Sequence, residues 1–138
     1  MSVTSTLAAG GVTDEPDTVE LRLPADSAYA SVLRTLTAGL AARVDFTMDD
    51  IEDLRIAVSE AAAMVLEEAD AGGVLDCRFQ VGPGRLALEI SAAAAKPESP
   101  DYESFGWQVL ATLADEASID AAPGRYAVRL VVRSSLAS

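Results

Sequence analysis

Histidine is absent from the 138-residue sequence, and the chain has one cysteine, Cys77. Without histidine, Ser-His-Asp and Cys-His catalysis are excluded, and the commonest general base and metal ligand are missing. One cysteine cannot form a disulfide within the chain, and Cys77 lies in an apparent strand, which favours a buried, unreactive thiol. The sequence therefore predicts no metal site and no thiol chemistry.

Basic residues are scarce as well, with 10 Lys and Arg against 22 Asp and Glu, a net charge of −12. Phosphate backbones are bound by clustered Lys and Arg, so we expect no direct contact with nucleic acid and favour a basic protein partner. No apolar run reaches the roughly 20 residues that cross a bilayer, and the N-terminus lacks a charged segment followed by an apolar core. We expect a cytoplasmic protein without membrane contact.

Aromatic residues make up only 5% of a chain that is 50% hydrophobic, so the core must be built from Leu, Val, Ile and Ala. The length suits one domain that buries roughly two-thirds of its unfolded surface. Residues 1–17 are rich in Ser, Thr, Gly and acids without periodicity, which predicts a disordered N-terminal tail. Residues 18–138 are predicted to form the single domain.

Periodicity predicts the order of the elements. Period-2 alternation indicates a strand over 18–23, a β-hairpin over 74–92 around the turn 82–85, and a further strand pair over 117–133. Helical spacing indicates helices over 26–43, 48–69 and 105–116, with a mobile loop over 93–104. This order predicts an α+β fold, a two-layer α/β sandwich with helices on one face of a mostly antiparallel sheet.

The helix over 48–69 is the most informative segment. Thr47 and Asp50 are spaced as in a capping box, and a core stripe is predicted from Ile51, Leu54, Val58, Ala62 and Val65. Ile56, Ala57, Glu60 and Met64 fall on a different side of the helix. A helix with two partly apolar sides is expected to cover something on both.

Residues 47–61, the preceding helix with Arg34, and residues 105–120 with Pro123 resemble the bacterial serine-kinase anti-sigma factors of sporulation and general stress. That family has the histidine-kinase-type (GHKL, or Bergerat) ATPase fold, and the resemblance covers roughly Val19 to Val132. It implies dimers that sequester an alternative sigma factor. It also implies release by an anti-anti-sigma partner, which the ATP-loaded form phosphorylates on serine.

The resemblance also shows which ATP-binding motifs have degenerated. The family motif Glu-x-x-x-Asn falls on Glu60 and Met64, and a thioether is too soft a donor for Mg²⁺, which demands hard oxygen ligands. The family motif Asp-x-Gly-x-Gly falls on Ala92, Ala94 and Lys96. Loss of the carboxylate that accepts from the adenine amino group costs on the order of 1–3 kcal/mol.

The phosphate-proximal Gly-x-Gly of the family is reduced to Gly106, between the rings of Phe105 and Trp107, which favours a filled pocket. Trp107 itself is predicted to be a core residue. These losses indicate a divergent, actinobacterial-looking branch of the family in which ATP and Mg²⁺ are cofactors only if the pocket still functions. Glu60 is then a locally hydrogen-bonded or solvated acid, or the residual base if the pocket is active.

Three functions follow from these observations. The leading prediction is an anti-sigma factor that represses by binding, without phosphorylation. The alternative is an active ATP-dependent serine/threonine kinase that phosphorylates an anti-anti-sigma protein. A third is an anti-anti-sigma protein or other regulatory adaptor on the same scaffold.

Arg34 aligns with an arginine through which the family binds the sigma factor, so it is the first candidate for partner contact. A surface pair with a helix acid is an equally good interpretation of that arginine. Weaker candidates share its helix: Asp26, Ser27, Ala30, Leu33 and Thr37. Homodimer formation is implied by the resemblance alone.

Overall fold

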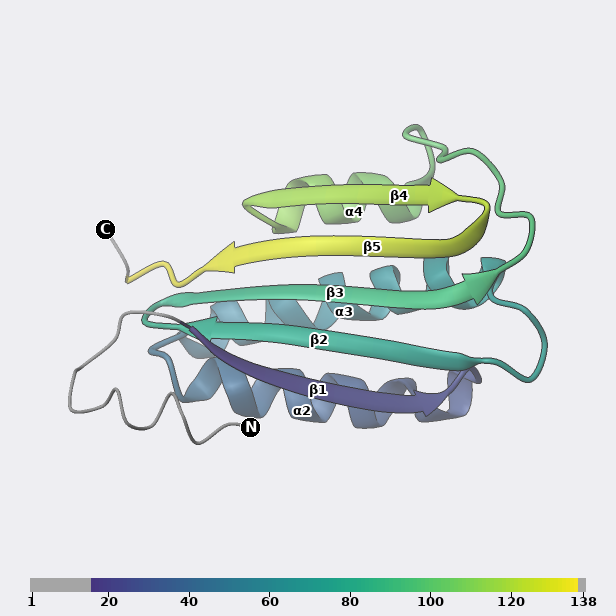
Figure 1. Ribbon diagram of the computed structural model, residues 1–138. Helices are drawn as coiled ribbons and strands as arrows, with labels where there is room; N and C mark the ends of the chain where they lie inside the picture. Colours follow the sequence, from purple (N-terminus) through teal and green to yellow (C-terminus); the bar gives the residue numbers. More distant parts are fainter. Residues whose placement is uncertain (1–15, 137–138) are drawn as a thin grey trace.

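The computed structural model describes residues 16–136, so nearly all of the predicted tail lies outside the described residues. Helices and strands follow the predicted order (Figure 1). The elements are β1 (Asp17–Pro24), the 3-10 helix η1 (Ser27–Tyr29), α2 (Ala30–Ala42), α3 (Met48–Glu68), β2 (Val74–Gly82), β3 (Arg85–Ala94), α4 (Phe105–Leu113), β4 (Glu116–Ala122) and β5 (Gly124–Arg133).

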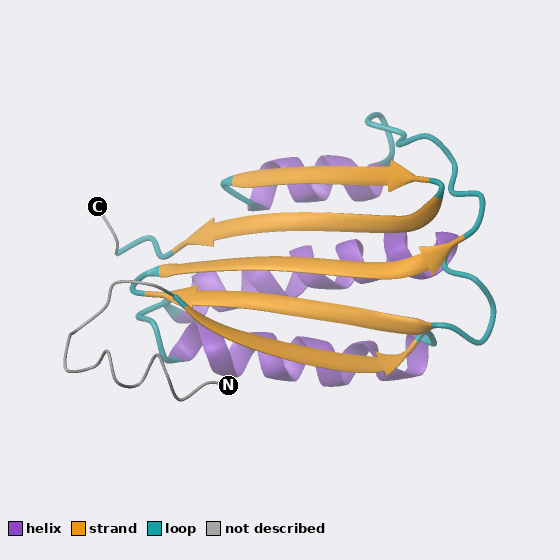
Figure 2. Ribbon diagram, in the orientation of Figure 1, coloured by secondary structure: helices purple, strands orange, loops and turns teal. Residues whose placement is uncertain are grey.

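One five-stranded sheet carries the fold, in the order β1-β2-β3-β5-β4. Every neighbouring pair of strands is antiparallel, so the sheet is fully rather than mostly antiparallel. In the described part of the chain, three α-helices lie behind one face of the sheet, and no helix covers the other face (Figures 1 and 2). The predicted fold class, an α+β sandwich of two layers, is confirmed. No helix between residues 16 and 136 is long and apolar enough to cross a membrane.

The central helix α3 begins with the predicted capping box. The Thr47 amide donates to Asp50 Oδ2 at 3.0 Å, and the Asp50 amide donates to Thr47 Oγ1 at 3.1 Å, which satisfies two amides that the first turn leaves free. Farther along, α3 packs against α2 and α4 and rests on β3 and β5. The expectation that this helix covers something on both sides is confirmed.

The core between the helices and the sheet is aliphatic, as the shortage of aromatic residues predicts. Leu54, Val58 and Val65 of α3 are buried with the smaller Ala57 and Ala61 of the same helix. Alanines in these positions let α3 lie close to its neighbours because no longer side chain separates the backbones. In the sheet, buried residues alternate with exposed charged ones, as in Leu75-Asp76-Cys77-Arg78-Phe79.

The first helical segment differs from the prediction. It opens as a 3-10 turn, in which Asp26 Oδ1 accepts from the Ala28 amide at 2.9 Å. Within α2 the buried line is Leu33, Thr37 and Ala41, spaced four residues apart. Tyr29 and Val32, two large apolar residues that helical spacing assigns to the buried side of this helix, are 40% and 45% exposed. The smaller Thr37 and Ala41 face inward because they allow a closer approach to the core than large side chains would.

Helix α4 ends at Leu113, earlier than the predicted Glu116. The Asp115 amide donates to the Val131 carbonyl at 2.9 Å, so the chain has already joined the sheet there. The Asp115 carboxylate in turn accepts from the Arg133 amide at 2.7 Å. The residues after Leu113, which helical spacing predicted to belong to the helix, therefore pair with β5 instead.

Candidate functional site

The motif residues Glu60 and Met64 meet Gly106 where α4 packs on α3. A Cβ atom placed at Gly106 would lie 3.3 Å from Glu60 Oε1 and 3.3 Å from Met64 Sδ. Ser104 caps α4 by accepting from the Trp107 amide at 3.2 Å, which fixes the start of the helix at this contact. The structure thus brings together three positions that the sequence singled out, in close side-chain packing.

Glu60 is half-buried at this contact. Among residues 16–136 its carboxylate has neither an ion pair nor a hydrogen bond, so of the two expectations, a local hydrogen bond or a solvated acid, the first is not seen.

The predicted filling of the pocket by aromatic rings is wrong for Phe105, which is 77% exposed. Trp107 is half-buried against the core and stands edge-on to Tyr102, with 4.9 Å between ring centroids and 78° between ring planes. The Met64 side chain against Gly106 occupies the space between α3 and α4 instead. A flexible thioether fills such an irregular gap well.

Ala92 and Ala94 lie on the helix-facing side of β3 and are buried in the core. Ala92 is paired with Tyr126 of β5. Lys96 is exposed in the loop that follows and makes no ion pair with a described residue. The end of β3 therefore presents methyl groups where an adenine amino group would need a carboxylate.

A small hollow remains beside this contact. It measures about 180 Å³ and lies between the end of α3, the loop after β3 and the start of β5. Pockets that bury cofactors of nucleotide size usually enclose roughly 300–1,000 Å³. Its lining residues are Met64, Glu67, Glu68, Glu98, Ser99, Asp101, Ser104 and Tyr126.

These residues do not fit a complex of Mg²⁺ with ATP. Carboxylates line the hollow where phosphates would have to approach, so like charges would meet. In the described part of the chain, no group of three or more acids, cysteines or histidines converges to hold a metal ion. Met64 supplies a thioether in place of the hard oxygen that Mg²⁺ requires.

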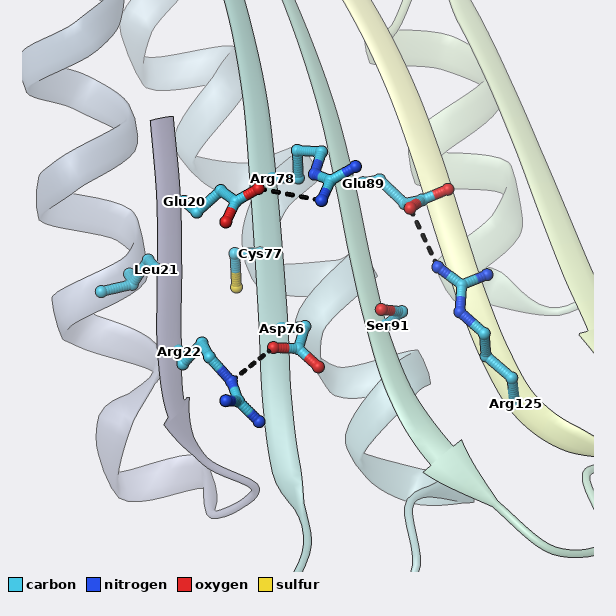
Figure 3. A pocket seen from close by; sticks show the side chains of 9 residues that line it. All are labelled: Glu20, Leu21, Arg22, Asp76, Cys77, Arg78, Glu89, Ser91 and Arg125. Atoms are coloured by element: carbon cyan, nitrogen blue, oxygen red, sulfur yellow. Dashed lines mark hydrogen bonds and ion pairs between the residues drawn. The ribbon is translucent and has the colours of Figure 1, made fainter. Parts of the chain in front are cut away.

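A second hollow, of about 390 Å³, lies on the uncovered face of the sheet (Figure 3). Three ion pairs cross it, joining neighbouring strands: Arg22 to Asp76 at 2.9 Å, Arg78 to Glu20 at 2.8 Å, and Arg125 to Glu89 at 2.9 Å. Each arginine is neutralised by an adjacent carboxylate, so the hollow offers no free cation to a phosphate. Exposed pairs of this kind contribute about 0–1 kcal/mol each.

The candidate partner residues on α2 fall into two groups. Arg34 and Ala30 are half-buried one turn apart, and Asp26 and Ser27 are exposed at the preceding turn. Arg34 forms no ion pair with any described residue, so the predicted pair with a helix acid is not seen. The four residues remain candidates for contact with a partner.

Leu33 and Thr37 were predicted as partner contacts and must be corrected, because both are fully buried. Thr37 faces the core and donates its hydroxyl to the Leu33 carbonyl at 2.8 Å, which satisfies the polar atom inside the helix. Sequence reasoning missed Tyr29 and Val32, whose exposed apolar surfaces are available at the same end of the helix. Their apolar character predicts that they are buried in the core. Only the packing of α2 shows that they lie at the surface.

Comparison with known proteins places this geometry in a family. A family model described as a histidine kinase-like ATPase domain matches residues 23–132. The chain belongs to the histidine kinase-like ATPase domain family. Solved structures agree in fold: the RsbU and RsbW domains of a Mycobacterium tuberculosis protein superimpose with a TM-score of 0.68 at 18% identity, over 85% of this chain and 32% of that one.

A histidine kinase domain from Erythrobacter litoralis EL346 gives a TM-score of 0.56 at 17% identity, over 95% of this chain and 69% of that one. At such identities the likeness shows the fold alone. Among curated histidine kinase-like relatives, the serine-protein kinase RsbW of Halalkalibacterium halodurans is 37% identical over 92 residues, 66% of this chain and 55% of the relative.

The serine-protein kinase RsbW of Bacillus subtilis is 37% identical over 78 residues, 54% of this chain and 49% of the relative. The chain thus spans about half the length of the curated relatives it matches. The resemblance to serine-kinase anti-sigma factors is confirmed by these relatives.

Proposed function

We propose that this chain is an anti-sigma factor that sequesters an alternative sigma factor in the cytoplasm and represses its transcription by binding, without phosphorylating a partner. The observation that carries the proposal is the packing of Met64 against Gly106, in a chain whose relatives are RsbW proteins. The relatives supply the scaffold and the class of partner. The contact fills space beside the motif residues, and the thioether of Met64 stands where a kinase of this fold would need an oxygen ligand.

Two further features support the loss of nucleotide chemistry. Ala92 and Ala94 are buried methyl groups at the strand end where base recognition would need a polar acceptor. The hollow beside Met64 is small and acidic. Losses at three separate places favour a binding protein, since a single replacement could be compensated elsewhere.

Charge supports a sigma factor as the partner. A protein that binds DNA presents basic surface, and a net charge of −12 attracts such a surface over a distance of about one Debye length. Complementary charge mainly speeds association and discriminates between partners. The proposed contacts are Arg34 and Ala30 on α2 and Asp26 and Ser27 at the 3-10 turn before it, with Tyr29 and Val32 added by their exposure.

Release is assigned to an anti-anti-sigma protein that competes for the complex, and the anti-sigma chain is proposed to act as a homodimer. Both come from the resemblance to RsbW proteins. The unphosphorylated partner would then be regulated by other means than this chain.

A pull-down tests the proposal. The full chain is expressed with a tag in its source cells, and captured proteins are identified by mass spectrometry. We expect a sigma factor, and we expect Arg34→Ala to lose it while Arg43→Ala retains it. Arg43 is the matched control because it is an exposed arginine at the end of the same helix. Recovery of an anti-sigma protein in place of a sigma factor would assign this chain to the adaptor class instead.

The alternative function is an active serine/threonine kinase. The feature that favours it is Glu60, which keeps the position of the catalytic base on α3. Incubation with ATP, Mg²⁺ and a candidate anti-anti-sigma protein would reveal phosphoserine if this alternative is correct. Loss of that signal in Glu60→Gln would then assign the base.

A further inference from the structure

The hollow beside Met64 is ringed by acids that have no basic partner. We call it the acidic pocket and define it by Glu67 and Glu68 at the end of α3, Glu98 and Asp101 in the following loop, and Tyr126 at the start of β5. Among the described residues, no ion pair engages any of the four carboxylates. Lys96, the one basic residue of the loop, has no ion pair there either.

Tyr126 gives the acidic pocket a polar floor. Its side chain lines the hollow and is only 5% exposed, and its hydroxyl makes no hydrogen bond with any described residue. Burial raises the pKa of Tyr126 above its usual value, and the charges of Glu68 and Glu67 add to that shift. A hydroxyl that no described residue engages can donate a hydrogen bond to a ligand in the hollow or accept one from it.

The arrangement of the acids indicates the kind of ligand. They are spread around the rim and do not converge on one point, and no metal-binding group forms among the described residues. Two of the carboxylates are already oriented: Glu68 Oε1 accepts from the Glu98 amide at 2.9 Å, and Asp101 Oδ1 accepts from the Glu103 amide at 2.9 Å. Their remaining oxygens stay available to an extended cation with several donors.

We propose that the acidic pocket receives an arginine side chain from a protein partner. A guanidinium carries five N–H donors in a fixed plane and can bridge separated carboxylates, whereas an ammonium is a point charge. Met64 and the Tyr126 ring provide apolar surface for the aliphatic stem, and the phenol oxygen accepts from the guanidinium. A volume of about 180 Å³ suits one side chain.

A protein is the favoured source of the arginine because the acidic pocket opens to the surface. Glu67, Glu98 and Asp101 are exposed at its rim, and the chain as a whole is strongly acidic. A basic protein segment can therefore approach under electrostatic attraction and insert one side chain. The lining of this surface comes from the end of α3, the loop after β3 and the start of β5, and includes none of the candidate contacts between Asp26 and Arg34, so it is a second site and goes beyond the proposed function.

The experiment titrates the full chain with three short peptides, acetyl-Gly-Arg-Gly-amide and its lysine and citrulline counterparts, at low salt. Backbone amide shifts are followed by NMR. We expect saturable shifts at residues 67–68, 98–101 and 126 with the arginine peptide and weaker or no shifts with the other two. Citrulline is the matched control because it keeps the shape of arginine and lacks its charge.

Variants separate a local site from general attraction. The double variant Glu67→Gln, Glu98→Gln should weaken binding about tenfold, and Tyr126→Phe about fivefold, because charge-assisted hydrogen bonds are lost. The control Glu52→Gln, Asp53→Asn removes the same charge from exposed positions at the other end of α3 and should change the affinity less than about twofold. Circular dichroism verifies that each variant is folded.

Three results would overturn the proposal. Equal binding of the citrulline peptide would remove the role of charge, and equal binding of the lysine peptide would remove the preference for a guanidinium. An equal loss in the control double variant would reduce the effect to the net charge of the chain. The pull-down described above is independent of all three, so failure here leaves the sigma-factor proposal standing.

Discussion

The Met64 sulfur lies so close to Gly106 that a Cβ atom on residue 106 would be 3.3 Å from it. Glycine at the start of α4 is therefore what lets this helix pack on α3. The same contact covers the side of α3 on which a nucleotide-binding member of this fold would carry its metal ligand. The packing of α4 on α3 and the proposed loss of nucleotide chemistry thus involve the same pair of residues.

Two glycines in helices should respond differently to alanine. In α2, a Cβ atom at Gly39 has no neighbour within 4 Å, so Gly39→Ala should stabilise by about 0.5–1 kcal/mol through helix propensity alone. At Gly106 the same gain is offset, because the methyl group meets Glu60 Oε1 and Met64 Sδ. Urea unfolding measures both free energies. An equal gain at the two positions would contradict the tight packing of α4 on α3.

The larger variant Gly106→Leu should destabilise the fold by about 1–3 kcal/mol, as overpacking of a filled space usually does. Adding Met64→Ala should restore part of the lost unfolding free energy, because the Met64 thioether is the group that the leucine side chain would meet. A double-mutant cycle in urea gives the coupling. Strictly additive effects would mean that Met64 does not fill the space beside Gly106.

Substitution of Leu33 should lower the stability of the fold, whereas substitution of the neighbouring Arg34 should leave it nearly unchanged. Leu33 is fully buried, so Leu33→Ala should cost about 2–5 kcal/mol of unfolding free energy. Arg34 has no ion pair among described residues, so Arg34→Ala should cost less than about 0.5 kcal/mol. Thermal unfolding checks both. A large loss of stability in Arg34→Ala would make that residue structural and remove it as an interface test.

Asp50 should make the fold sensitive to acid. Burial raises the pKa of its carboxyl, but hydrogen bonds from Thr47 and Ser135 lower it by more, and the net pKa is below its usual value. A depressed pKa in the folded state stabilises at pH values above the unfolded pKa of about 4, and this contribution is lost as the pH falls through the folded pKa.

The difference in unfolding free energy between the wild type and Asp50→Asn should therefore be constant near neutral pH and shrink below about pH 4. Asp49→Asn is the control, since Asp49 is an exposed acid in the same helical turn. Urea unfolding between about pH 3 and 7 measures both. The account of Asp50 is wrong if the two variants show the same pH dependence.

Cys77 should not react with thiol reagents in the folded protein. Burial, and secondly the charge of Asp76, raises the pKa of the thiol to about 12, and only the thiolate attacks such reagents. Labelling by an aromatic disulfide near pH 8 should proceed at the rate at which the sheet opens, and urea should accelerate it steeply. Rapid labelling without denaturant would place Cys77 outside the core.

Much of the fold could be predicted from local patterns. The capping pair Thr47 and Asp50 marks the start of α3, and the alternation around Cys77 marks β2, because caps and period-2 burial depend on a few adjacent residues. The face of α2 that turns inward could not be predicted in the same way. Thr37 is buried and Tyr29 exposed because of how closely α2 lies on the core, which one sequence does not encode locally.

The sequence alone could show which ATP-motif residues are missing from the candidate site. It could not show how the residues that stand in their place pack together. Met64, Ala92 and Ala94 stand out by residue type alone, since a thioether and methyl groups cannot do the work of an amide and a carboxylate. Their packing depends on α4 and β5, which lie far along the chain. The grouping of Tyr126 with Glu68 and Asp101 likewise arises only when the loop folds over the end of α3.

Calorimetric titration of the full chain with ATP and Mg²⁺ distinguishes a protein that acts by binding from a nucleotide-dependent kinase. A binding protein whose pocket is closed by Met64 against Gly106 should give no heat of binding up to millimolar nucleotide. A dissociation constant in the micromolar range, lost in Glu60→Ala, would contradict the account and identify an active nucleotide site.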